Sequence, residues 1–190
     1  MRVLAVLAWA AFLQADTGEP FYRFSRGASW TYRQSRGGTA SRVVLTVTGE
    51  EEGKVIQESK EYVEEGKEPR VRTLAWAVEG GYLVWGEYRG GKIVSPLRVY
   101  KPGSKKGDTW KSPVGEGKEE LEAVHLGTNE VKVAAGTYPD AIQVAFRFGS
   151  PGEKPLLEIV LVPKVGMVRF GGSAGGVQAV MELAEFRPGK

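Results

Sequence analysis

The segment that most resembles a catalytic motif is Gly171-Gly172-Ser173-Ala174-Gly175. It fits the G-x-S-x-G pattern of a serine nucleophile on a sharp turn. In hydrolases built this way a strand precedes the serine, a helix follows it, and an acid and then a histidine come later in the chain. Here the single histidine, His125, precedes Ser173, and the following residues read as a strand. The run also lacks the Lys-Ser/Thr of a phosphate-binding loop. It therefore predicts a hairpin turn between two strands.

Other catalytic chemistry has little support. No cysteine is present as a nucleophile, and we expect His125 to be half-exposed on a strand that approaches a turn. Glycoside hydrolysis needs two carboxylates at a fixed separation in a cleft. The glutamate-rich stretches 49–54, 61–69 and 117–122 instead mix glutamate with glycine and lysine, which is typical of solvated hairpin turns. A glutamate-dependent enzyme acting on glycans is our third hypothesis, and no catalytic residue is assigned.

Metal, cofactor and nucleic-acid functions are not predicted. One histidine without cysteine leaves only carboxylates as metal ligands, and no aspartate-rich calcium loop is present. The 26 basic and 23 acidic residues are nearly balanced, and the basic ones are scattered rather than gathered with aromatic residues. We expect no metal, no cofactor and no nucleic-acid partner.

The first fifteen residues, MRVLAVLAWAAFLQA, predict a cleaved secretory signal peptide. Arg2 gives a positive start, and the apolar run 3–13 is shorter than the ~20 residues of a membrane span. An uncleaved N-terminal anchor is the alternative, and a lipid anchor is not expected because no cysteine follows the run. We expect a periplasmic or extracellular protein with no transmembrane segment after cleavage, and one domain over residues 16–190. Abundant Glu, Lys and Arg with few Asn and no Cys give it a thermophile-like composition.

Short alternating runs bounded by turn residues predict strands throughout the chain. In residues 42–49, Val43, Leu45 and Val47 share one face, and similar alternation recurs between Gly- and Pro-containing turns. The stretch 176–186 is the one helix candidate, and we interpret it as a strand because its apolar residues alternate. The prediction is an all-β fold: a strongly curved antiparallel sheet or an open or half-closed β-barrel of about 10–12 strands.

A tryptophan-bearing motif occurs twice. Gly27-Ala28-Ser29-Trp30 returns as Gly107-Asp108-Thr109-Trp110, and each copy is followed by a glycine turn, at 47–49 and at 125–127. Further on, residues 79–87 parallel residues 163–172, which places Trp85 in the position of Phe170. The order predicts two tandem meanders, about 16–102 and 103–190, with the glycine turning the chain and the tryptophan anchoring the strand.

Aromatic residues are the feature most suggestive of a ligand. They either fill the core or line a concave apolar pocket. Residues 82–88 carry aromatics on both faces of one strand, which is more than a sheet with one solvated face requires. The candidate ligand-binding residues are Trp30, Tyr32, Trp76, Tyr82, Trp85, Tyr88 and Trp110.

Four motifs in order resemble a family of exported bacterial β-rich proteins and lipoproteins of unknown function. They are FYRFSRGASWTY (21–32), KKGDTW (105–110), VAAGTYPDAIQV (133–144) and VPKVGMV (162–168). The chain departs from that pattern at its aromatic entry, where no proline follows, and at Lys164, where the family often has glycine. These proteins are similar to the half-open barrels of periplasmic lipoprotein carriers. The resemblance implies an envelope protein with a concave ligand- or partner-binding face and no catalytic residues.

Our leading hypothesis is therefore a non-enzymatic exported protein that binds a hydrophobic, lipid- or lipoprotein-like ligand on a concave sheet face. The alternative is a structural or interaction module with a filled core, whose partner would be another envelope protein.

Overall fold

A computed structural model describes residues 21–64, 66–114, 119–148, 155–174 and 176–190, so the predicted signal peptide lies outside the described residues. Within these ranges one antiparallel sheet contains twelve strands, and strands that follow each other in the chain are paired, except β6 and β7. β1 also pairs with β12, which leaves β6 and β7 as the two edges. The strands are β1 (Ser29–Arg36), β2 (Thr39–Glu51), β3 (Lys54–Tyr62), β4 (Arg70–Glu79), β5 (Tyr82–Arg89), β6 (Lys92–Tyr100), β7 (Thr109–Val114), β8 (Glu119–Val133), β9 (Gly136–Arg147), β10 (Leu157–Val162), β11 (Gly166–Ala174) and β12 (Val177–Arg187).

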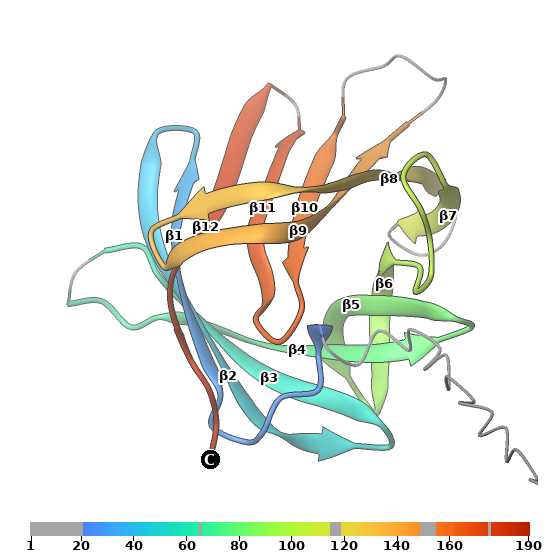
Figure 1. Cartoon of the computed structure of the whole chain (residues 1–190). Coiled ribbons are helices and arrows are strands. Elements are labelled where there is room, and N and C mark those ends of the chain that lie inside the picture. The colour runs from blue at the N-terminus through green and yellow to red at the C-terminus, as the bar shows by residue number, and fades with distance from the viewer. Residues whose placement is uncertain (1–20, 65, 115–118, 149–154, 175) are drawn as a thin grey trace, which may run out of the picture.

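The sheet curls into a nearly closed barrel (Figure 1), which confirms the predicted all-β fold. The edge strands β6 and β7 are not paired with each other as strands of the sheet. Hydrogen bonds that involve side chains join them instead, and we call this junction the seam. The backbone N–H of Arg98 donates to Ser112 Oγ at 2.8 Å, and the indole N–H of Trp110 donates to the Arg98 carbonyl at 2.8 Å. Trp110 therefore ties the two edges together. In the described part of the chain, no helix is long and apolar enough to cross a membrane.

Period-two alternation sets the faces of the strands. Val43, Leu45 and Val47 are buried in the interior of the barrel, while their neighbours in β2 are half-buried or exposed. The helix candidate near the C-terminus is a strand, β12, in which Met181 and Leu183 alternate with more exposed residues. Residues 171–174 of the G-x-S-x-G run form the end of β11 and pair with β12, and Gly175 lies outside the described residues.

The two Gly-x-x-Trp motifs begin equivalent turns. Gly27 and Gly107 both have positive φ, 84° and 93°, which favours glycine. Gly27 N–H donates to the Val47 carbonyl at 2.9 Å, and Gly107 N–H donates to the His125 carbonyl at 2.8 Å. The residue after each glycine then accepts from that same partner's N–H, at 2.9 Å in both copies. In the chain, strands β1–β6 precede residues 101–108 and strands β7–β12 follow them. The origin of the two halves by duplication stays a prediction.

Aromatic side chains fill the end of the barrel where β1 begins and β12 ends. Trp30 contacts Phe24 at 4.7 Å and Phe186 at 5.3 Å between ring centroids. The indole N–H of Trp30 donates to the Val165 carbonyl at 2.6 Å, at the turn that leads into β11. The Tyr32 hydroxyl donates to the Met167 carbonyl at 2.7 Å one step further along. This end of the barrel is therefore packed with aromatic side chains.

Candidate ligand-binding site

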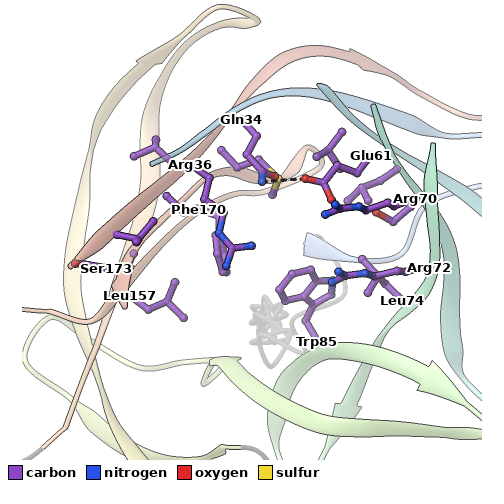
Figure 2. A pocket seen from close by; sticks show the side chains of 18 of the residues that line it. Gln34, Arg36, Glu61, Arg70, Arg72, Leu74, Trp85, Leu157, Phe170 and Ser173 are labelled. Carbon is purple, nitrogen blue, oxygen red and sulfur yellow. Dashed lines mark hydrogen bonds between the residues drawn. The ribbon is translucent and has the colours of Figure 1, made fainter. Parts of the chain in front are cut away.

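A cavity of about 480 Å³ lies at the end of the barrel opposite the packed aromatic cluster (Figure 2). Its walls include Arg36 at the end of β1, Arg70 at the start of β4 and Val177 at the start of β12. It is therefore placed beside the β1–β2 and β11–β12 turns, at the upper end of the barrel in Figure 1. Its volume lies within the roughly 300–1,000 Å³ typical of small-molecule pockets.

The inward faces of the strands change from apolar to polar toward this cavity. Along β1 the inward residues are Trp30 and Tyr32 in the packed core, then Gln34 and Arg36 in the cavity wall. Successive side chains of a strand alternate between faces, so these four residues form one row. A ligand that enters the cavity meets charged groups first and apolar groups deeper.

The deeper part of the cavity is apolar. Trp85 and Phe170 contact each other edge to face, with ring centroids 5.8 Å apart, and Trp76 lies behind Trp85 at 5.9 Å. Trp85 and Phe170 both line the cavity, whereas Trp76 is buried in the core. The other apolar residues of the lining are Val43, Leu45, Leu74, Leu156, Leu157, Val177, Ala179, Val180 and Met181.

Trp85 differs from the other three tryptophans of the described ranges. The indole N–H groups of Trp30, Trp76 and Trp110 donate to Val165 O, Gln57 Oε1 and Arg98 O, respectively. The buried Trp85 Nε1 has no hydrogen-bond partner among the described residues. Among these four tryptophans, Trp85 is thus the one whose side chain lines the cavity and whose indole N–H makes no hydrogen bond to a described residue.

The mouth of the cavity carries three arginines, Arg36, Arg70 and Arg72, which we name the arginine rim. All three are exposed, and within the described ranges none of them has an ion-pair partner. One carboxylate, Glu61, also lines the cavity and accepts hydrogen bonds from Gln34 Nε2 at 3.3 Å and Ser41 Oγ at 3.5 Å. Three guanidinium groups against one carboxylate leave the mouth positively charged.

The seven aromatic candidates are distributed over the whole barrel. Trp85 lines the cavity, and Tyr82 is half-buried beneath Arg98, whose guanidinium carbon lies 4.8 Å from its ring centroid. Tyr88 belongs to a second apolar cluster on the opposite face of β5, with Ala75, Ala77, Val84 and Ile93. This cluster accounts for the aromatics on both faces of the strand. The remaining candidates are buried in the main core: Trp30, Tyr32, Trp76 and Trp110.

His125 is buried, not half-exposed as the sequence predicted, because its ring packs edge to face against Tyr100, with ring centroids 6.0 Å apart. Its Nδ1 lies 3.1 Å from Ser104 Oγ, and its Nε2 has no partner among the described residues. Burial lowers the pKa of His125, and the nearby Asp108 carboxylate opposes this shift. Ser173 lines the cavity and His125 does not, so the cavity does not bring the two together.

Sequence reasoning missed the arginine rim and the place of Phe170 in the site. The signal was present in β4, where Arg70, Arg72, Leu74 and Trp76 occupy one face of a strand. When the side chains on one face of a strand change from arginine to leucine and tryptophan, that face extends from a polar opening into the core. The candidate site thus combines the rim with the apolar residues beneath it.

Neither protein-family models nor curated protein sequences match this chain. Two solved structures share its fold. One is a candidate lipoprotein from Parabacteroides distasonis, with a TM-score of 0.56, 16% identity, and coverage of 88% of this chain and 98% of that one. The other is a candidate exported protein with a YmcC-like fold from Bacteroides fragilis, with a TM-score of 0.54, 13% identity and the same coverage of 88% and 98%. At these identities the likeness shows the fold alone.

Proposed function

We propose that this chain is a non-enzymatic exported protein of the cell envelope that holds a hydrophobic ligand inside its barrel. The observation that carries the proposal is the cavity of about 480 Å³, whose deeper walls are aromatic and aliphatic. Burial of apolar ligand surface contributes roughly 25 cal/mol per Å². A pocket of this size and lining suits a ligand with an aliphatic chain.

Two further observations support an envelope protein. The N-terminal sequence has the charge, length and small residue of a secretory signal. The two proteins that share the fold are named as a candidate lipoprotein and a candidate exported protein. Both observations support the proposal that this chain is exported.

In this proposal the aromatic residues have different tasks. Trp85 and Phe170 contact the ligand, because both line the cavity. Trp30 and Tyr32 fix the start of β11, and Trp110 joins the edges of the sheet. A direct ligand contact by any of the six other candidates of the sequence analysis stays a prediction.

The test is saturable binding of N-phenyl-1-naphthylamine, a neutral fluorescent probe of apolar sites. We expect the wild-type protein to bind it, and the variant Ala179→Phe to bind it at least about tenfold more weakly, because Ala179 lines the cavity. The matched control is Gln178→Phe, since Gln178 is the exposed neighbour of Ala179 on the same strand and does not line the cavity. Equal binding by all three proteins would place the probe outside the cavity and contradict the proposal. No saturable binding by the wild type would favour a structural or interaction module.

A further inference from the structure

The arginine rim identifies the class of ligand. We infer that the cavity takes a single-chain amphiphile with an anionic head group, whose chain enters the apolar part while its head group binds the rim. This inference rests on the proposed function, since it assumes that the cavity holds a hydrophobic ligand. It adds the charge and the orientation of that ligand.

The first argument is that the three rim arginines form no ion pair among the described residues, whereas three other arginines of the barrel do. Arg147 contacts Glu122 at 2.6 Å, Arg169 contacts Glu182 at 2.8 Å and Arg187 contacts Glu185 at 2.6 Å. The three rim arginines have no such carboxylate among the described residues, although they lie close enough to line one cavity. Three positive charges beside the single carboxylate of Glu61 leave a net repulsion at the mouth, and an anion bound among the arginines would relieve that repulsion.

The second argument is the direction of the side chains. Figure 2 shows Arg36 and Arg72 extending into the cavity from opposite sides, with Phe170 beneath the first and Trp85 beneath the second. A head group bound between them would lie directly above the aromatic pair. Guanidinium groups present planar donors that match the two oxygens of a carboxylate or the oxygens of a phosphate.

The third argument is the order of polarity along the strands. On the inward face of β4, Arg70 and Arg72 precede Leu74, and on that of β1, Arg36 follows Gln34 and Tyr32. Both rows run from charge at the mouth to apolar groups within the barrel. An amphiphile has the same order of polarity along its length, whereas an acidic peptide without an apolar chain would leave the deeper part of the cavity unfilled.

The experiment compares ligands that share one chain and differ in head group. Dodecanoate, dodecyl phosphate, dodecan-1-ol and dodecyltrimethylammonium are each used, below their micelle concentrations, to displace N-phenyl-1-naphthylamine. We expect at least one of the two anions to bind about tenfold more tightly than the alcohol, and the cation to bind more weakly than the alcohol. The two anions distinguish a carboxylate head group from a phosphate.

Charge-removing variants then assign the preference to the rim. In Arg36→Gln/Arg72→Gln, anion binding is expected to fall about tenfold while dodecan-1-ol binds as before, which also reports that the cavity is intact. The matched control is Arg33→Gln/Arg42→Gln, which removes two exposed arginines that face each other on the outside of β1 and β2. This control should keep the preference for anions.

The outcomes separate this inference from the proposed function. Equal affinity for anions and alcohol would contradict the inference of an anionic head group, while the proposal of a hydrophobic ligand would still hold. Failure of all four ligands to displace the probe would overturn the proposed function itself. Displacement by poly-glutamate but not by dodecanoate or dodecyl phosphate would overturn the amphiphile in favour of an acidic protein segment.

Discussion

Trp85 and Phe170 lie edge to face, 5.8 Å apart, on the wall of a cavity inside the barrel. Trp85 belongs to β5 in the first half of the chain, and Phe170 belongs to β11 in the second. These same two residues occupy equivalent positions in the internal repeat of the sequence. Corresponding positions of the two halves therefore meet in the interior and form the aromatic part of the candidate site.

Ligand binding should change the fluorescence of Trp85. Among the tryptophans of the described ranges Trp85 lines the cavity, so an aliphatic chain beside its ring should shift its emission. We expect dodecanoate to shift the emission of the wild-type protein and to leave that of Trp85→Phe unchanged. Trp110→Phe should keep the shift, because Trp110 lies at the seam. A shift of equal size in Trp85→Phe would place the ligand elsewhere.

The seam between β6 and β7 should be sensitive to loss of Ser112. This side chain is fully buried, and its oxygen accepts the hydrogen bond from the Arg98 N–H. Ser112→Ala leaves that donor without its partner and should lower the free energy of unfolding by about 1–3 kcal/mol. Urea unfolding followed by circular dichroism measures the change. The exposed control Ser35→Ala should stay within about 0.5 kcal/mol of the wild type, and an equally small effect of Ser112→Ala would contradict this account of the seam.

Two neighbouring glycines of β11 should respond differently to alanine. A Cβ atom at Gly172 would lie 2.9 Å from the Leu156 carbonyl oxygen, whereas one at Gly171 meets nothing closer than 3.9 Å. Gly172→Ala should therefore lower the free energy of unfolding by about 1–3 kcal/mol. Gly171→Ala should be tolerated and cost much less. Equal costs in urea unfolding would show that strand β11 adjusts to the added methyl group.

Stability should fall on mild acidification because of His125. Burial lowers its pKa in the folded protein, so the unfolded chain binds a proton first as the pH drops below about 6.5. The contribution of His125 is therefore fully present above about pH 6.5 and is lost as the pH falls toward the lower folded pKa. His125→Gln should lose less stability than the wild type between about pH 7.5 and pH 5.5. The same loss in both proteins would show that His125 is not the group responsible.

The fold was largely predictable because strand alternation and turn glycines are local signals. The alternation of Val43, Leu45 and Val47 fixed the inward face of β2, and the repeated Gly-x-x-Trp marked two equivalent turns. The burial of His125 was not predictable, since it depends on contacts of its ring with Tyr100 and Ser104, which lie 21 or more residues earlier in the chain.

The candidate site was only partly predictable, because alternation says which side chains point inward but not how far along the barrel they lie. Trp30 and Trp85 are both inward-facing aromatics, yet Trp30 is in the packed end and Trp85 borders the cavity. Register across strands decides this placement. The same limit hid the rim, since Arg36 and Arg72 come together only when β1 and β4 are placed in one barrel.

The most direct test of the ligand is a crystal structure of the protein with dodecanoate that carries bromine on its terminal carbon. Anomalous scattering locates the bromine independently of the protein atoms. The proposal predicts a bromine peak beside Trp85 and Phe170, with the carboxylate between Arg36 and Arg72. A bromine peak outside the barrel, or the reverse orientation with bromine at the arginine rim, would contradict it.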